Sequence, residues 1–334
     1  MKRFLDLADF SREELLTLLE LARRLERQPE PRALAGKILG LLFFNPSLRT
    51  LASCQAAMAR LGGSSFVINP GQGSWQLETR SGVVMDGAAA EHVREGIPVL
   101  ASYCDALGIR AFAHGKDLAS DLAETDFSAL AALSDKPLIN LESAMNHPCQ
   151  ALADWKTLDD LAVARHGRFV LSWAWHPRAL PLAVPAAAVH MAALRGMEVI
   201  VLRPEGFALP PALMQRATAA ARHSGGSVRE TSERADALPG ADVLYVKEWG
   251  ATSCYGDAAG DARLRAALSG WCVRNDWFAA APHCRVMHCL PVRRNSAIAD
   301  EVLDSPRSIV QREAYNRLVV QMAVLYRMLK GDQQ

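Results

Sequence analysis

Ser47, Arg49 and Thr50 stand at a point of the chain where a helix is expected to begin. They follow the apolar run 38–44, which predicts a buried strand, and the Asn-Pro pair at 45–46, which ends it. The start of a helix offers unpaired backbone N–H groups and the positive end of the helix dipole. A guanidinium and two hydroxyls added there predict a site for a dianion, above all phosphate. An ordinary strand, turn and helix, with Ser47 as the N-cap and Arg49 in solvent, fits this segment equally well.

Three further polar side chains stand where predicted strands end or a helix begins. Arg110 closes the apolar run 106–109, and ligands of open α/β sheets bind beyond the carboxyl ends of the strands. His147 and Gln150 follow the strand predicted at 137–141 and open the next helix. An imidazole there can donate a hydrogen bond to a polarised carbonyl, and a glutamine can bind an amide. The alternatives are an arginine that reaches out to water and a histidine that is satisfied by nearby backbone.

Trp75 and the segment 288–295 complete the set of candidates. Trp75 lies in a glycine-rich loop, where it can anchor the core, an interface or the wall of a ligand site. Arg293 and Arg294 follow another predicted strand and suit an anion or a carboxylate, or else are solvated surface charges. Zinc is not expected, because no CxxC or HxxxH pair occurs and no standard ligand spacing fits the nearby His283, Cys284, His288 and Cys289.

The motifs of several enzyme classes do not occur in this sequence. There is no GxxxxGK[ST] loop of nucleoside triphosphatases, no GxGxxG after a strand and no GxSxG nucleophile elbow. A nicotinamide cofactor is therefore unsupported, and we expect neither a cofactor nor a metal. A site rich in Arg, Ser, Thr and His can instead catalyse by holding two reactants together and stabilising developing negative charge.

Composition excludes several kinds of partner. Lys and Arg number 37 against 36 Asp and Glu, a formal net charge of +1, which argues against a general role on nucleic acids or membrane surfaces. No apolar run reaches the length of a membrane span, and the N-terminal residues lack the apolar core of a signal peptide. The seven scattered cysteines suit free thiols in a reducing cytoplasm. We therefore expect a cytoplasmic protein without a nucleic-acid or membrane partner.

The elements that position these residues alternate in type. A capping box at 11–14 precedes a helical apolar stripe of Leu15, Leu18, Leu19, Ala22 and Leu25. From there strands alternate with helices, which predicts an α/β fold with parallel sheets covered on both faces. The predicted strands are 38–44, 64–68, 107–112, 137–141, 168–173, 198–202, 242–246 and 284–288. The predicted helices are 49–61, 91–104, 117–133, 148–164, 182–195, 210–223 and 312–330.

Four motifs in this order carry a family resemblance over essentially the whole chain: Phe44-Asn45-Pro46-Ser47-Leu48-Arg49-Thr50, Arg110, His147-Pro148-Cys149-Gln150 and His288-Cys289-Leu290-Pro291. On these motifs the chain resembles the aspartate/ornithine carbamoyltransferase family. The resemblance implies two α/β domains, each a mainly parallel sheet flanked by helices. A carbamoyl-phosphate-binding domain would span 1–150, joined by the C-terminal helix at 312–334, and an amino-acid-binding domain would span 151–311. The resemblance also implies a homotrimer with sites at the subunit interfaces.

The resemblance further implies a role for each motif residue. Thr50, Arg110 and His147 would be the catalytic residues that polarise the carbamoyl oxygen. Trp75 would reach the phosphate in a neighbouring subunit's site, and Gln150 would lie near the carbamoyl amide. An amine must attack in its neutral form, so the rate should rise with pH across neutrality. The full set implied for carbamoyl phosphate is Ser47, Leu48, Arg49, Thr50, Trp75, Arg110, His147, Gln150, Cys289, Leu290 and Arg317.

The remaining motifs resemble the branch of this family that acts on Nα-acylated ornithines. The Ser-Met-Gly loop of the ornithine enzymes is absent, whereas several segments look like the acylornithine branch: 75–78, 85–87, 172–178 and 290–295. By this resemblance Glu142, His176, Lys247 and Arg293 would bind the acylornithine. Glu142 would orient the attacking amine, and Lys247 and Arg293 would pair with carboxylates. Without the resemblance, ordinary strand-end charges would be the interpretation of Lys247 and Glu142.

Ala90 is the residue that the resemblance connects with the acyl group. The acetyl members carry a glutamate at this position and a lysine after an Arg-Arg-Asn sequence, whereas this chain has Ala90 and continues from Asn295 with Ser296 and Ala297. A carboxylate at position 90 would repel a succinyl carboxylate, and a small neutral residue leaves room for it. We therefore expect N-succinylornithine as the acceptor in arginine biosynthesis, although the succinyl members often carry proline at this position.

Other acceptors and one other class of function stay open. N-acetylornithine is the nearest alternative, followed by ornithine or another amine such as a diamine. Lys247 and Arg293, as partners for acceptor carboxylates, argue against a diamine. A non-catalytic sensor of a phosphate ligand is the alternative outside enzymes, and the presence of Arg49, Arg110 and His147 argues against it.

Overall fold

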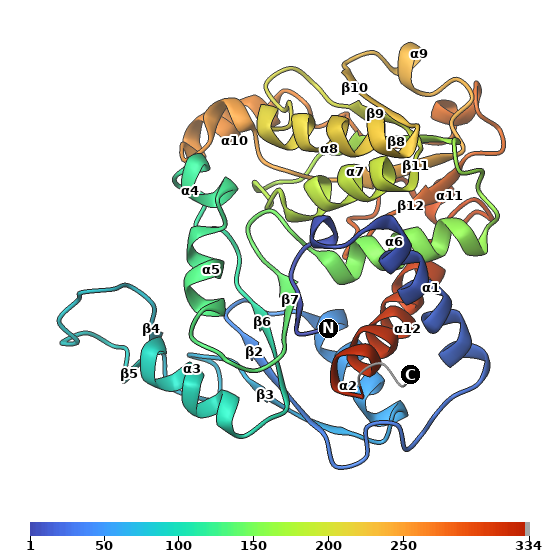
Figure 1. The fold of residues 1–334 in the computed structure, drawn as a ribbon. Coiled ribbons are helices and arrows are strands. Elements are labelled where there is room, and N and C mark those ends of the chain that lie inside the picture. The colour runs from blue at the N-terminus through green and yellow to red at the C-terminus, as the bar shows by residue number, and fades with distance from the viewer. Residues whose placement is uncertain (331–334) are drawn as a thin grey trace. The chain divides into compact units, whose positions relative to one another are not determined.

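The structure is a computed structural model that describes residues 1–330. It divides into two compact units (Figure 1). Unit 1 comprises Met1–Ala113, Ala123–Cys149 and the chain from Arg317, and unit 2 comprises His114–Leu122 and Gln150–Asn316. Each unit is built on one five-stranded parallel sheet flanked by helices, so the predicted fold class is confirmed.

The sheet of unit 1 has the strand order β1-β7-β6-β2-β3, and every neighbouring pair is parallel. Its register pairs Phe43 with Arg110 and Arg110 with Glu142, so the carboxyl ends of three strands meet at one edge. A separate two-stranded sheet joins β4 to β5. The strands are β1 (Arg3–Phe4), β2 (Ile38–Phe43), β3 (Ser64–Ile68), β4 (Leu77–Glu78), β5 (Glu91–His92), β6 (Ala106–Arg110) and β7 (Leu138–Glu142).

The crossover connections distribute the helices of unit 1 over both faces of its sheet. The chain steps outward from β2 to β3 and then back to β6 and β7, which places α2 on one face and α3 and α5 on the other (Figure 1). Leu42, Ile97, Leu107 and Phe127 belong to the core on the α3 and α5 side. The helices are η1 (Leu7–Asp9), α1 (Arg12–Arg27), α2 (Leu48–Arg60), α3 (Val93–Ser102) and α5 (Thr125–Ala131), and α12 (Val310–Leu329) enters the unit at Arg317.

The sheet of unit 2 repeats this plan with the strand order β10-β9-β8-β11-β12. The crossovers from β8 through β9 to β10 place α7 and α8 together on one face (Figure 1). The strands are β8 (Arg168–Trp173), β9 (Glu198–Leu202), β10 (Ser227–Thr231), β11 (Val243–Lys247) and β12 (Arg285–Met287). The helices are α4 (Leu118–Leu122), α6 (Pro148–Asp160, from Gln150 onward), α7 (Ala183–Arg195), α8 (Pro211–Ser224), α9 (Arg234–Ala237), η2 (Thr252–Cys254), α10 (Ala258–Ala266), η3 (Asn275–Phe278) and α11 (Asp300–Leu303).

Most predicted elements lie within a few residues of their observed bounds. The capping box is complete, since Ser11 Oγ accepts from Glu14 N–H and the Glu14 carboxylate accepts from Ser11 N–H, and the predicted stripe of α1 is buried. The single helix expected at 117–133 is wrong, because the chain forms α4 and α5 with Glu124 in the left-handed backbone conformation between them (φ 52°). The patterns do not predict the very short strands β1, β4 and β5, or the half-exposed edge strand β10.

Candidate active site

The predicted phosphate segment lies between β2 and α2 at the carboxyl edge of the unit 1 sheet. Ser47 is the N-cap of α2, and its Oγ accepts the Thr50 N–H at 3.2 Å. Leu48 is exposed, Arg49 is partly buried and Thr50 is buried. Thr50 Oγ1 accepts a 2.6 Å hydrogen bond from Nη2 of Arg317 on α12. The first turn of α2 therefore combines helix-start N–H groups, hydroxyls and a guanidinium, which together suit an anion.

Arg110, Glu142 and His147 form a buried cluster at the same edge. Arg110 ends β6 and Glu142 ends β7, and Arg110 Nη1 pairs with Glu142 Oε2. His147 Nε2 lies 3.4 Å from the same carboxylate oxygen. Arg110 also stacks on the ring of Phe112, with Cζ 4.5 Å from the ring centroid. Arg110 therefore does not reach out to water, and the Nε2 of His147 faces a carboxylate and not a backbone group.

His147 is neutral in this environment. Burial lowers its pKa well below the ordinary value, and the positive charges of Arg317 and Arg110 lower the pKa further. Its contact with Glu142 is therefore between a neutral imidazole and a carboxylate, not an ion pair. Within residues 1–330, His147 Nδ1 has no hydrogen-bond partner although it is buried. A buried polar atom without a hydrogen-bond partner raises the free energy of the folded state, so this nitrogen is a candidate contact for a ligand.

Replacing His147 with glutamine is expected to weaken the dependence of stability on pH. The pKa of His147 is held below 6.5 in the folded chain and returns towards 6.5 on unfolding, so the unfolded chain binds more protons in mildly acidic solution. The wild type therefore loses stability as the pH falls below 6.5, and His147→Gln should lose less. Thermal unfolding between about pH 5 and pH 7 measures the difference. His223→Gln, at an exposed histidine of α8, is the matched control, and an equal slope in all three proteins would contradict the assignment of a neutral His147.

Trp75 and Ala90 lie at the two ends of one exposed loop in unit 1. The Trp75 side chain is 61% exposed, so the interpretation of Trp75 as a core anchor is wrong. Its Nε1–H donates to Glu91 Oε2 at 2.9 Å. Ala90 is exposed directly before β5, and its N–H donates to the backbone oxygen of Gln76 at 3.2 Å. The small sheet of β4 and β5 therefore fixes both ends of the loop, while the indole is available at the surface.

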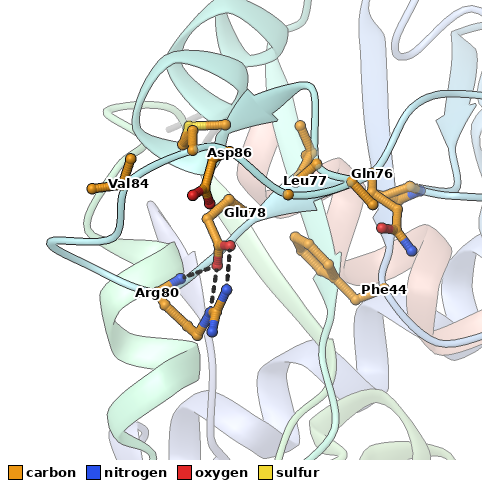
Figure 2. A pocket seen from close by; sticks show the side chains of 12 residues that line it. Phe44, Gln76, Leu77, Glu78, Arg80, Val84 and Asp86 are labelled. Atoms are coloured by element: carbon orange, nitrogen blue, oxygen red, sulfur yellow. Dashed lines mark hydrogen bonds and ion pairs between the residues drawn. The ribbon is translucent and has the colours of Figure 1, made fainter.

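A pocket of about 390 Å³ lies between this loop and Phe44, the residue that follows β2. Figure 2 shows Phe44 and Gln76 on one side of the pocket and Asp86 on the other. Arg80 and Glu78 line it as a two-point ion pair, with Nε–Oε1 at 3.0 Å and Nη2–Oε2 at 2.8 Å. These hydrogen bonds lower the pKa of Glu78 to about 2. The pocket thus joins a residue of the phosphate motif to the loop that carries the predicted specificity position.

Lys247 begins a buried charge chain in unit 2. Its Nζ lies 3.0 Å from Oε2 of Glu248, which also lies 3.2 Å from His288 Nε2. Burial raises the pKa of Glu248, but the adjacent Lys247 and His288 outweigh burial and hold that pKa well below the ordinary value. His288 Nδ1 accepts the Leu290 N–H at 2.8 Å, so its proton is assigned to Nε2, which donates to Glu248. Leu290 itself has a left-handed backbone (φ 58°).

His176 and Arg293 meet in unit 2. Arg293 Nε donates to His176 Nε2 at 2.9 Å. The proton of the imidazole is therefore assigned to Nδ1, which lies 2.8 Å from the backbone oxygen of Arg178 and 3.0 Å from the backbone nitrogen of the same residue. Burial lowers the pKa of His176, which agrees with a neutral ring that accepts from a guanidinium.

Gln150 is held by two buried carboxyl groups. Its Nε2 donates to Asp154 Oδ1 at 2.8 Å and to Glu313 Oε1 at 3.2 Å. The second oxygen of Glu313 accepts the His288 N–H at 2.8 Å. Burial, with Asp154 beside it, raises the pKa of Glu313 well above the ordinary value. Both amide hydrogens of Gln150 are thus engaged, and within residues 1–330 its buried Oε1 has no partner.

The predicted site residues fall into three groups in the structure. The first is the unit 1 cluster of Thr50, Arg110, Glu142, His147 and Arg317, beside the helix start with Ser47, Leu48 and Arg49. The second is the unit 2 cluster of Gln150, His176, Lys247, Cys289, Leu290 and Arg293. The third is the loop with Trp75 and Ala90. Arg294, left open between ligand and surface charge, is exposed and pairs with Asp300 and Asp304.

Several residues of these clusters have no signal in the sequence. Asp154 and Glu313 accept hydrogen bonds from the predicted site residue Gln150, and Glu248 pairs with the predicted site residue Lys247. Of these three carboxyl groups, only Glu248 could have been noticed in the sequence, because it stands next to Lys247. Across residues 1–330, no group of three or more His, Cys, Asp or Glu could hold a metal ion. In the same part of the chain, no helix is long and apolar enough to span a membrane.

Comparisons with known proteins agree with this geometry. Models of two domains match the chain: the carbamoyl-P binding domain of aspartate/ornithine carbamoyltransferase over residues 2–160 and its Asp/Orn binding domain over residues 184–328. N-succinylornithine carbamoyltransferase of Bacteroides thetaiotaomicron is 37% identical over 296 residues, which cover 89% of this chain and 88% of the relative. N-acetylornithine carbamoyltransferase of Xanthomonas campestris pv. campestris is 37% identical over 329 residues, which cover 97% of each chain.

Solved structures match over nearly the whole chain. One is an N-acetyl-L-ornithine transcarbamylase variant with alanine in place of a glutamate, complexed with carbamyl phosphate and N-succinyl-L-norvaline. It matches with a TM-score of 0.94 at 37% identity, covering 98% of this chain and 100% of that one. Acetylornithine transcarbamylase complexed with acetylcitrulline also matches with a TM-score of 0.94, at 36% identity and 98% and 99% coverage. On these matches and its own motifs, the chain belongs to the aspartate/ornithine carbamoyltransferase family and is a carbamoyltransferase.

Proposed function

We propose that the chain transfers the carbamoyl group of carbamoyl phosphate to the δ-amine of N-succinylornithine. The amine nitrogen bonds to the carbamoyl carbon, the bond from that carbon to the phosphate oxygen breaks, and the amine loses one proton. The products are N-succinylcitrulline and phosphate, within arginine biosynthesis. The observation that carries the proposal is the buried unit 1 cluster, in which Arg110, Arg317 and a neutral His147 gather at the edge where the phosphate segment lies.

The phosphate of the donor suits the start of α2. Ser47, Leu48, Arg49 and Thr50 supply backbone N–H groups, hydroxyls and a guanidinium, and Arg317 adds a second guanidinium through its contact with Thr50. The carbamoyl oxygen would accept hydrogen bonds from Thr50, Arg110 and His147. A neutral imidazole that carries its one proton on Nδ1, the nitrogen without a partner within residues 1–330, can donate without adding a third positive charge beside two guanidiniums. Fixed donors of this kind stabilise the negative charge that develops on the oxygen during attack.

The carbamoyl amide suits Gln150 and the 289–290 segment. Both hydrogens on Gln150 Nε2 are donated to carboxyl groups, so the amide has no donor left for a ligand. Its Oε1, which has no partner within residues 1–330, can accept an N–H of the carbamoyl group. Cys289 and Leu290 would present their backbone to the same group. The hydrogen bond from Leu290 N–H to His288 fixes this backbone.

The acceptor suits the charged groups of unit 2 and the carboxylate of Glu142. Lys247 and Arg293 would pair with acceptor carboxylates, and His176 orients the Arg293 guanidinium. Glu142 would accept from the attacking amine and orient it. N-succinylornithine carries two carboxylates, which agrees with two cationic partners.

The choice of succinyl rests on Ala90. Structures of N-acetyl-L-ornithine transcarbamylase with one glutamate replaced by alanine, serine, proline or valine are complexes with N-succinyl-L-norvaline. Ala90 would stand in this chain where the acetyl enzymes carry their glutamate. N-acetylornithine is the second candidate, because an N-acetylornithine carbamoyltransferase is as similar to the chain as the succinyl relative.

Assembly and location are part of the same proposal. We propose a cytoplasmic homotrimer in which Trp75 of one chain contacts the phosphate in a neighbouring site, and the exposure of Trp75 supports this role. The carbamoyl phosphate domain would be 1–150 joined by 312–334, and the acylornithine domain would be 151–311. A phosphate-ligand sensor without turnover is the outcome to exclude.

The rate at saturating substrate is expected to rise with pH between about 6.5 and 9. The acceptor must attack as a free amine, and the fraction of free amine grows with pH, whereas His147 is already neutral at the lower end. A steady-state profile of kcat against pH measures this. A rate that falls over the range would instead require a protonated group in the transition state.

The direct test incubates the purified chain with carbamoyl phosphate and N-succinylornithine. Phosphate release and formation of the ureido product should match one to one. A sample without acceptor corrects for spontaneous decay of carbamoyl phosphate. If the chain binds carbamoyl phosphate but forms no product with any ornithine derivative, the transferase proposal is contradicted. A non-catalytic sensor of a phosphate ligand then becomes the better interpretation.

A further inference from the structure

A buried turn at 143–146 connects two proposed active-site residues. Glu142 ends β7 on one side of the turn, and His147 precedes α6 on the other. All residues of the turn are buried. Buried backbone N–H groups need partners, and a turn leaves several without the regular ones of a helix or sheet. The positions of Glu142 and His147 therefore depend on what holds this turn.

The Glu124 carboxylate supplies the partners for the turn. Its Oε1 accepts from Ser143 Oγ at 2.6 Å, from Met145 N at 2.8 Å and from Asn146 Nδ2 at 3.1 Å. Its Oε2 accepts from Ala144 N at 3.1 Å. One carboxylate thus receives four hydrogen bonds, two of them from backbone, and every residue of the turn contributes one. Hydrogen bonds to an ionised acceptor are the strong ones.

The local structure at Glu124 is explained by this engagement. Glu124 is the N-cap residue of α5, yet its side chain makes no capping hydrogen bond. Its backbone is left-handed (φ 52°, ψ 36°), a conformation that residues other than Gly, Asn and Asp rarely adopt. Glu124 therefore lacks a capping hydrogen bond and has a left-handed backbone, and it is the residue whose carboxylate holds the turn. Backbone strain of this kind persists where the contacts of the surrounding structure require it.

We propose that Glu124 is a positioning residue that fixes the 143–146 turn and thereby aligns Glu142 and His147 for carbamoyl transfer. The proposal rests on the function proposed above for these two residues. Glu124 touches no reacting atom in it. It acts through the separation of the Glu142 carboxylate and the His147 imidazole, which is 3.4 Å here, and through the pairing of Glu142 with Arg110.

Glu124→Gln tests the proposal with almost no change in volume. The amide places an NH₂ group where an oxygen now accepts, so at least one donor of the turn loses its partner. We expect kcat to fall about ten- to a hundredfold, because small misplacements of reacting groups carry costs of this order. The KM for carbamoyl phosphate should change by a smaller factor than kcat, because Ser47 and Arg49, which would hold the phosphate, lie on another segment. Because an unfolded fraction also lowers the apparent kcat without changing KM, kcat is expressed per folded molecule.

Two controls separate positioning from stability. Phe127→Leu alters a buried residue of the same helix without touching the turn, and it should keep its kcat per folded molecule. Ser143→Ala removes one donor from the carboxylate and should lower kcat less than Glu124→Gln. The two changes combined should be less than additive, because they act on one network.

Amide hydrogen exchange gives a readout that does not depend on turnover. Glu124→Gln should speed exchange at Ala144 and Met145 and leave β7 unchanged. Faster exchange together with a reduced kcat supports the proposal. Unchanged exchange, an unchanged kcat, or an equal loss of kcat in Phe127→Leu would each overturn it. Turnover by the wild type is measured first, so that its absence counts against the proposed function and a loss confined to the variant counts for the positioning role.

Discussion

Replacing Arg49 with alanine is expected to weaken carbamoyl phosphate binding by about a hundredfold or more. Arg49 stands in the first turn of α2, partly buried, two residues after the N-cap Ser47. A guanidinium there can form charge-assisted hydrogen bonds with phosphate that alanine cannot replace. The expected result is a large rise in the KM for carbamoyl phosphate and the loss of detectable binding of inorganic phosphate by calorimetry.

Arg60→Ala is the matched control for this change. Arg60 ends the same helix and is exposed, so its removal lowers the net charge equally without altering the start of α2. It should leave the KM within about twofold of the wild type. Equal KM values for Arg49→Ala and the wild type would show that the segment is only the ordinary strand, turn and helix.

Ala90→Glu is expected to shift the acceptor preference from succinyl towards acetyl. A second carboxylate facing the succinyl carboxylate adds like-charge repulsion, whereas an acetyl group has no charge to repel. The ratio of kcat/KM for N-succinylornithine to that for N-acetylornithine should fall by about ten- to a hundredfold. Repulsion in a partly exposed loop is screened, so the effect should shrink as salt is raised.

Ala88→Glu is the control for Ala90→Glu. Both alanines are exposed on the same loop and the two variants carry the same added charge. If charge anywhere on the loop decided the preference, the two variants would behave alike. If Ala90→Glu leaves the ratio untouched, position 90 does not discriminate between the acyl groups.

The fold follows from local patterns because its strands and helices are long and periodic. The apolar run at 38–44 predicts a buried strand, and the apolar stripe of α1 predicts the buried face of a helix. Neither prediction needs the rest of the chain. The expected helix at 117–133 was wrong because the Glu124 carboxylate engages the turn at 143–146, a contact between segments about twenty residues apart. Strand β10 lacks an apolar pattern because it is a half-exposed edge strand.

Part of the candidate site is also legible from the sequence. Ligands of open α/β sheets bind beyond the carboxyl ends of the strands, so Arg110 was expected at the ligand edge. Glu142 was indicated only by the family resemblance, and the register pairs it with Arg110 at that edge. The residues that fix the predicted substrate-binding side chains in place were not expected from the sequence. Glu248, Glu313 and Glu124 act through partners that are distant in sequence or lie on another element. The fold buries Glu248 and Glu313 and partly buries Glu124, whereas in the sequence all three resemble ordinary surface charges.

A parallel assay of three acceptors tests the central claim most directly. The purified chain receives carbamoyl phosphate with N-succinylornithine, N-acetylornithine or ornithine, and kcat/KM for the ureido product is compared. We predict the largest value for N-succinylornithine, with ornithine the poorest acceptor. A largest value for N-acetylornithine would contradict the role given to Ala90, and a largest value for ornithine would contradict the assignment to acylated acceptors altogether.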